Sequence, residues 1–296
     1  FVIAWTCLLL LNVMGFIFTA KISDSLQFDM LKGIMVFMLS FYPFYYFSIM
    51  GHLDRNDLSA FFIIKLVIEV LQFFSNRNDI LSIGFLSIEN VINNIAYEFV
   101  GLFPFIFLFK GKKFLSIIIT AIILYFVISG AKRGAFIVAM VILIFLLFYQ
   151  AKSADSRNRI SRFVGNAVFF LIILIILDRF YLRNQYLNSR LTDLVQGDTS
   201  GRIIIYSNIL SNWINDNIGY KTFGHGFAAS IITSGTGNYA HNDWLELLSN
   251  FGVIGVFVYI LVFYYGIRLA FNKDWNTEKR ILAGTIIIAG FAISLF

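Results

Sequence analysis

Residues 244–267 read WLELLSNFGVIGVFVYILVFYYGI, a long apolar run in which Glu246 is the only charged residue. A helix of roughly 20 apolar residues spans the hydrocarbon of a bilayer, where unpaired backbone groups find no water. The run therefore predicts a membrane-spanning helix. The whole chain has this character, because 59% of its 296 residues are hydrophobic, only 14% are charged, and the mean hydropathy is +0.80. Such a composition excludes an ordinary soluble domain.

Similar apolar runs recur along the chain and predict an all-α, polytopic transmembrane helix bundle, with residues 1–296 as a single membrane domain. Nine spans are predicted, at about 1–20, 30–50, 58–74, 92–109, 114–129, 134–149, 163–178, 244–267 and 281–296. The first run lacks the small-residue site of a cleaved signal peptide, so we interpret it as a span. Because the chain starts at Phe1 and stops within an apolar run, we interpret it as part of a longer protein.

The basic residues predict the orientation of these spans. They gather in three short connections, which the positive-inside rule places in the cytoplasm. These residues are Lys110, Lys112, Lys113, Lys152, Arg157, Arg159, Arg162, Arg268, Lys273, Lys279 and Arg280. The turn at 129–133 and the long segment 179–243 then lie outside, and the segment is the only extramembrane piece large enough for an active site. The net charge of +6 is mostly this topology signal, and no nucleic-acid partner is expected.

Basic residues on the predicted outer side indicate an anion site. Lys132 and Arg133 occupy the outer turn against the cytoplasmic preference of basic residues, and Arg202 opens an amphipathic helix predicted at 202–213. A guanidinium fork matches diphosphate oxygens, and a helix N-terminus adds to the attraction. The alternatives are snorkelling to lipid headgroups for the outer turn and an ordinary solvated position for Arg202.

The segment 239–248, YAHNDWLELL, predicts a histidine at the outer membrane surface. Asn242 or Asp243 is expected to cap the following helix, which puts His241 just before the hydrocarbon begins. Neutral histidine accepts a proton near neutral pH, so His241 is a candidate general base. The alternative is a polar residue that merely lines the surface.

The pattern His-Asn-x-x-Leu-Glu-x-Leu that starts at His241, with Gly252-x-x-Gly255 after it, resembles the signature of the O-antigen ligase and O-antigen polymerase superfamily. The resemblance covers about residues 114–270. Three further pieces follow the family's order: Arg133-Gly134-Ala135, Gly201-Arg202 and Gly224-His225-Gly226. The chain departs from the family at two positions, with Lys132 where serine is frequent and Tyr206 where tryptophan is frequent.

The resemblance implies a GT-C-like glycosyltransferase of the bacterial cytoplasmic (inner) membrane, acting in O-antigen, lipopolysaccharide or capsule synthesis. Its donor would be a polyprenyl-diphosphate-linked glycan such as one on undecaprenyl diphosphate. Its acceptor would be another lipid-linked glycan for a polymerase, or lipid A core for a ligase. We favour the polymerase, because the outer face adds little positive charge that could bind a phosphorylated core. Other polysaccharide-assembly proteins are further candidate partners. Arg133 and Arg202 would bind the diphosphate, His241 would assist the acceptor hydroxyl, and the candidate supporting residues are Lys132, Tyr206, His225 and Asn242.

No cofactor is expected, and we predict metal independence. The segment 179–243 has neither an Asp-x-Asp pair nor a cluster of His and Cys, although its single aspartates leave Mg²⁺ open. A lipid-linked glycan flippase or another transporter is the alternative from a different class. Lys65 and Glu69 lie four residues apart within a predicted span and are expected to pair. The sequence lacks the paired broken helices that many carriers have.

Overall fold

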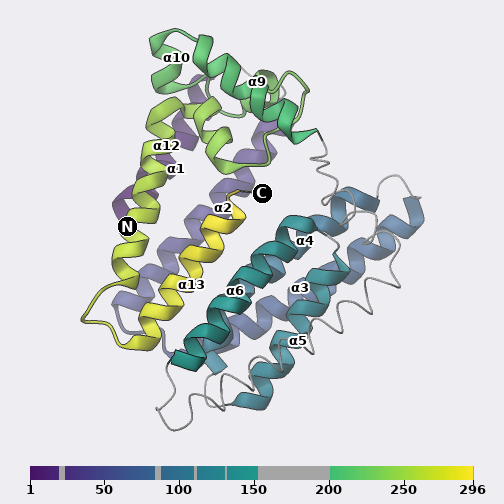
Figure 1. Ribbon diagram of the computed structural model, residues 1–296, viewed down its shortest axis with the longest axis vertical. Coiled ribbons are helices and arrows are strands. Elements are labelled where there is room, and N and C mark those ends of the chain that lie inside the picture. Colours follow the sequence, from purple (N-terminus) through teal and green to yellow (C-terminus); the bar gives the residue numbers. More distant parts are fainter. Residues whose placement is uncertain (20–23, 84–87, 110–111, 131, 153–200, 296) are drawn as a thin grey trace. The chain divides into compact units, whose positions relative to one another are not determined.

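The computed structural model describes residues 1–19, 24–83, 88–109, 112–130, 132–152 and 201–295. These residues form helices joined by turns, with no strand among them, which confirms the all-α prediction (Figure 1). The chain divides into two compact units, each described by itself. The first comprises Phe1–Asp54, Thr199–Trp275 and Ser294–Phe296, and the second comprises Arg55–Asp198 and Asn276–Ile293.

Three helices in the described part of the chain are long and apolar enough to cross a membrane: Leu26–Ile49, Arg55–Asn76 and Asp243–Ala270. Shorter apolar helices occupy Val2–Phe18, Ile95–Phe109, Phe114–Ser129 and Gly134–Phe145. The described residues therefore contain helices able to span a membrane at three of the predicted positions, 30–50, 58–74 and 244–267. The count of nine spans and the GT-C-like arrangement stay predictions, and the predicted span 163–178 lies outside the described residues.

In the first unit, two N-terminal helices pack against a long helix from the C-terminal third of the chain. It contains α1 (Val2–Phe18), α2 (Asp24–Ile49), α9 (Arg202–Asn215), α10 (Ile218–Phe223), α11 (Ser230–Thr233) and α12 (Asp243–Ala270). Helix α1 packs on both α2 and α12. A buried cluster of Ala4, Leu8, Leu9, Met38 and Val262 joins the three helices.

The second unit is a bundle built around aromatic side chains. It contains α3 (Arg55–Ile83), α4 (Ile88–Leu102), η1 (Phe103–Phe109), α5 (Lys113–Ser129), α6 (Arg133–Lys152) and α13 (Thr277–Ile293) (Figure 1). The ring of Phe126 stacks on Phe99 with centroids 4.7 Å apart and meets Phe73 edge-on at 4.9 Å. Rings at such distances and angles attract one another beyond the area they bury.

The predicted span 92–109 is not one continuous α-helix. Helix α4 ends at Leu102 and a 3₁₀ segment follows, because Pro104 has no N–H to donate and disfavours the α conformation at the residue before it. The Arg55 guanidinium donates hydrogen bonds of 2.9 and 2.8 Å to the carbonyls of Phe107 and Leu108. The side chain therefore satisfies carbonyl groups that the tightened backbone leaves open.

The pairing of Lys65 with Glu69 is confirmed. The two side chains form an ion pair within α3, and the Lys65 Nζ also lies 3.5 Å from Glu98 Oε2 of α4. The Glu69 side chain is buried, whereas those of Lys65 and Glu98 are about half exposed. The three charges thus link α3 to α4 in the apolar part of the bundle.

The predicted span 244–267 lies within α12, which is not one straight helix, because the chain reverses direction at Gly252. Gly252 has φ 60° and ψ −154°, a conformation that breaks the helix and suits a residue without a Cβ atom. The ring of Trp244 lies 5.0 Å from that of Tyr259 and 5.8 Å from that of Phe263. Residues so far apart in a straight helix would be separated by more than about 20 Å. Residues 243–251 and 253–270 therefore form the two limbs of a helical hairpin.

Candidate functional site

Helix α9 begins at Arg202, as the sequence predicts. Gly201 precedes it in the left-handed region with φ 76°, where glycine pays no steric penalty. On the buried side of α9, Ile205 and Ile209 are 6% and 1% exposed, while Arg202 itself remains partly exposed. Arg202 thus lies in the first turn of an amphipathic helix, where free N–H groups and the helix dipole favour anions.

Side-chain amides tie α9 to the turns that follow it. Asn208 Nδ2 donates to the Ser234 carbonyl and Asn212 Nδ2 to the Thr233 carbonyl, both at 2.7 Å. Trp213 Nε1 donates to the Lys221 carbonyl at 3.1 Å. Each bond satisfies a carbonyl in the last turn of a short helix, α10 or α11, or at the residue just after it, where the helix supplies no donor. The short helices that follow α9 are therefore held against its residues 208–213.

An apolar cluster joins α9 to the segment that carries His241. Buried Ile205, Ile209 and Ala240 form its centre, with Tyr206 and Leu245 packed against it. Tyr206 is one helical turn beyond Arg202, so the two residues share a face of α9. Ala240 immediately precedes His241. Arg202 and His241 are thus close in sequence to residues of the same packed cluster, within one unit.

His241 adopts a backbone conformation that is uncommon for a residue with a side chain. Its φ is 53°, in the left-handed region, and its side chain is exposed. The imidazole meets the Tyr239 ring edge-on with centroids 5.3 Å apart. A residue held in this region costs free energy unless its surroundings fix it, and such residues gather at functional sites. The strained backbone is therefore a second reason, besides the sequence pattern, to treat His241 as a candidate functional residue.

Two side chains fix the backbone on either side of His241. Asn242 is the cap expected from the sequence, because its Oδ1 accepts from the N–H groups of Trp244 and Leu245, both at 3.1 Å. The carboxylate of Glu246 reaches back and accepts from the N–H of Ala240. The role of Glu246 was missed in the sequence, although an acidic residue in the first turn after a capping asparagine is a signal for such a contact.

The segment Gly224-His225-Gly226 docks on the reversal in α12. Breaking the helix at Gly252 leaves the carbonyls of Ser249 and Asn250 without their helical donors, and they accept instead from the N–H groups of His225 at 2.9 Å and Gly226 at 2.8 Å. Gly224 has φ 74°, and a Cβ there would lie 2.4 Å from the Asn250 carbonyl. Close backbone approach therefore requires the first glycine of this motif.

The His225 ring is engaged in the loop rather than directed to a free surface. Its Nε2 lies 2.7 Å from Asp216 Oδ2, and its ring stacks on Tyr220 with centroids 4.3 Å apart. Asp216 is one of the single aspartates that left Mg²⁺ open, but its pairing with His225 was not predicted, because the pairing depends on a turn that no local pattern reveals. These contacts bind the end of α9 to the loop on the α12 reversal.

The two basic residues of the predicted outer turn belong to the second unit. Lys132 Nζ lies 6.0 Å from the centre of the Tyr97 ring, within the range of a cation–π interaction. Arg133 is the first residue of α6, but its side chain is not among those that the structure describes. The structure therefore groups Arg202, Tyr206, His225, His241 and Asn242 in one unit and Lys132 and Arg133 in the other.

Metal ligands of the usual kinds do not cluster in the described part of the chain. No group of three or more His, Cys, Asp or Glu side chains there is arranged to hold a metal ion. Asp193 and Asp198, two of the aspartates that left Mg²⁺ open, lie outside the described residues.

Comparison with known proteins identifies one family. Residues 118–260 match the family model described as O-antigen ligase. The matched range contains Lys132, Arg133, Arg202, Tyr206, His225, His241 and Asn242. No curated protein and no solved structure matches the chain.

Proposed function

Because the chain belongs to the O-antigen ligase and polymerase superfamily, we propose that it transfers a glycan from a polyprenyl diphosphate to an acceptor sugar hydroxyl. Family membership supports membrane glycan transfer of this general type. The reaction would take place at the outer face of the bacterial cytoplasmic membrane, with the predicted segment 179–243 outside. Of the two possible acceptors, we favour a second lipid-linked glycan, which makes the protein a polymerase.

One observation carries this proposal: the packed cluster that joins Arg202 to His241. The transfer needs a cation for the leaving diphosphate and a base for the acceptor hydroxyl. The proposal assigns these two groups to Arg202, one helical turn before Tyr206, and to His241, which follows Ala240, and both Tyr206 and Ala240 belong to the cluster. A fixed frame of this kind keeps the groups in position without reorganisation during the reaction.

In the proposed reaction the acceptor oxygen attacks the anomeric carbon of the donor sugar. A new carbon–oxygen bond forms, the bond to the diphosphate breaks, and the electron pair leaves with the diphosphate. His241 takes the proton from the acceptor hydroxyl, which contributes roughly 10²- to 10⁴-fold in rate. Arg202, together with Arg133, holds the diphosphate and stabilises its growing charge. Attack from the opposite face inverts the anomeric centre, and product NMR showing retention would contradict this step.

The supporting residues act on the frame in this proposal. Tyr206 packs in the cluster with Ala240, and Asn242 caps the limb that follows His241. The His225 ring contacts Asp216 at the end of α9, while its backbone N–H donates to Ser249 at the α12 reversal. Lys132 lies over Tyr97 in the second unit and would add positive charge next to Arg133. Metal is not needed for this chemistry. Sustained inhibition by EDTA that Mg²⁺ reverses would contradict metal independence.

A transporter of lipid-linked glycans is the second candidate. The buried carboxylate of Glu69, paired with Lys65 in the apolar part of the bundle, favours it, because charges within membrane spans frequently mark transport pathways. The alternative makes a separate prediction, which is dependence on an ion or proton gradient. Activity of the purified protein without a gradient would remove it.

The decisive experiment is glycan transfer by the full-length protein in nanodiscs with a purified polyprenyl-diphosphate oligosaccharide. Wild type is compared with Arg202→Ala, His241→Ala and Arg133→Ala, and with Lys221→Ala as a matched control near the loop. Chain growth on donor alone supports the polymerase, whereas transfer that requires added lipid A core supports the ligase. If the three variants fold and transfer glycan like wild type, the assigned site is wrong.

A further inference from the structure

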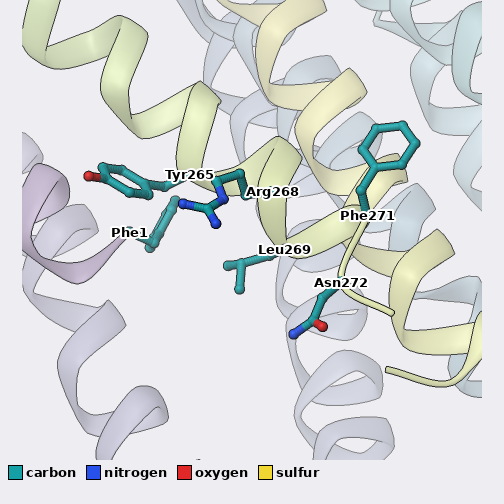
Figure 2. Close-up of a pocket in the computed structure, with 6 residues that line it drawn as sticks. All are labelled: Phe1, Tyr265, Arg268, Leu269, Phe271 and Asn272. Carbon is teal, nitrogen blue, oxygen red and sulfur yellow. The ribbon is translucent and has the colours of Figure 1, made fainter. Parts of the chain in front are cut away.

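The last turn of α12 carries an arginine that the proposed transfer does not use. Arg268 lies two residues before the helix ends at Ala270 and lines a cavity of about 500 Å³ (Figure 2). The other lining residues are Phe1, Tyr265, Leu269, Phe271 and Asn272. All belong to the first unit, and the cavity is at the opposite end of the second α12 limb from the reversal at Gly252.

The length of this limb puts the cavity at the depth of lipid headgroups. Residues 253–270 form a helix about 27 Å long, close to the roughly 30 Å thickness of bilayer hydrocarbon. When the limb crosses the membrane, Arg268 therefore reaches the boundary between acyl chains and headgroups. Arginine and aromatic residues are typical of that boundary.

The Arg268 guanidinium forms no ion pair with the residues that the structure describes. It is exposed, and in the part of the chain that the structure describes no carboxylate lies within ion-pair distance of it. The end of the helix already has backbone partners, because the N–H groups of Phe271 and Asn272 donate to the carbonyls of Ile267 and Leu269. The guanidinium is thus available to an external anion.

The walls of the cavity match the remainder of a phospholipid. Tyr265, Leu269 and Phe271 are exposed apolar or aromatic side chains, and Phe271 is 70% exposed. Figure 2 shows the Arg268 guanidinium between Phe1 and Leu269, with the Asn272 amide at the turn after the helix. A guanidinium binds phosphate oxygens in two places, and an amide donates to esters or hydroxyls.

We propose that this cavity binds the headgroup of an anionic phospholipid, with Arg268 on the phosphate and the apolar walls along the glycerol and the start of the acyl chains. The site is independent of the transfer chemistry, because neither Arg202 nor His241 contributes to it. A bound lipid would anchor the end of α12 at one membrane surface. The reversal in the same helix is thereby held at a set depth.

The test is native mass spectrometry of the full-length protein in detergent, titrated with phosphatidylglycerol, phosphatidylcholine or soluble glycerol phosphate. Wild type is compared with Arg268→Gln and with Lys279→Gln, which removes one charge from another basic residue of the same predicted connection. We expect phosphatidylglycerol to bind wild type and Lys279→Gln alike, and Arg268→Gln about tenfold more weakly, as for loss of a charged hydrogen bond.

Three outcomes would overturn the proposal. The first is equal retention of phosphatidylglycerol by Arg268→Gln and wild type, and the second is equal binding of phosphatidylcholine by wild type. The third is full competition by glycerol phosphate at the same concentration, which would indicate a free-anion site instead. If Arg268→Gln does not fold, the proposal is tested with Arg268→Lys, because lysine keeps the charge but loses the guanidinium fork. The preference of wild type for phosphatidylglycerol over phosphatidylcholine is then the second measurement.

Discussion

The Tyr259 hydroxyl donates a hydrogen bond of 2.8 Å to Asp243 Oδ2, although sixteen residues separate the two along one helix. In a straight helix they would lie about 24 Å apart. The bond therefore closes the hairpin of α12 and joins the residue after the Asn242 cap to the second limb. Through it, the second limb of α12 supports the segment that carries His241.

Replacing Tyr259 with Phe removes only this hydroxyl. We expect the free energy of unfolding to fall by about 1 kcal/mol, because a hydrogen bond is lost while the packing of the ring on Trp244 remains. Thermal unfolding in detergent measures the change. Tyr264→Phe, at an exposed position of the same limb, is the control and should behave like wild type. Equal melting temperatures for both variants would mean that the bond does not close the hairpin.

Gly252→Ala tests the reversal itself. A Cβ at Gly252 would lie 2.5 Å from the Thr222 carbonyl, and the residue has a positive φ that alanine rarely adopts. We expect a loss of more than about 2 kcal/mol in stability, since both strain and a backbone clash arise. Gly33→Ala in α2 is the matched control. An added Cβ there meets nothing within 4 Å, so that variant should be neutral or slightly stabilised.

The reversal also shows where sequence reasoning stops. Helix α9 and the Asn242 cap are predictable, because amphipathic spacing and a capping residue are local signals. The reversal at Gly252 is not predictable in this way, since residues 244–267 read as one apolar run. What stabilises the break is distant in sequence: the N–H groups of His225 and Gly226 satisfy the carbonyls that the break exposes.

His225 is expected to act through the loop and not on the substrate. In His225→Phe the ring can still stack on Tyr220, but the contact with Asp216 is lost. We expect faster hydrogen exchange in residues 216–226 and a lower melting temperature, with glycan transfer reduced much less than in His241→Ala. Loss of transfer as complete as in His241→Ala, with exchange unchanged, would instead place His225 in the chemistry.

The ion pair in α3 is expected to matter mainly as a pair. Lys65→Met leaves the buried Glu69 carboxylate without its partner, at a cost of about 1 kcal/mol or more. The double variant Lys65→Met with Glu69→Leu removes both charges and should recover most of that loss. Thermal unfolding of Lys65→Met, of Glu69→Leu and of the double variant gives the coupling energy between the two side chains. Additive losses would show that Lys65 and Glu69 contribute independently.

Glu246 is expected to position His241 without taking part in proton transfer. Its carboxylate accepts from the N–H of Ala240, the residue before the histidine, while Asn242, the residue after it, caps the helix that follows. Glu246→Ala should lower kcat for glycan transfer about tenfold or more, because a charge-assisted hydrogen bond is lost, and should leave KM for the donor nearly unchanged. The informative variant is Glu246→Gln, whose amide oxygen still accepts from Ala240. If Glu246 acts by position, glutamine restores most of kcat and leaves the pH dependence of transfer as in wild type. If glutamine is as inactive as alanine, the carboxylate itself takes part in the reaction, and the assignment of His241 as the base would have to be revised.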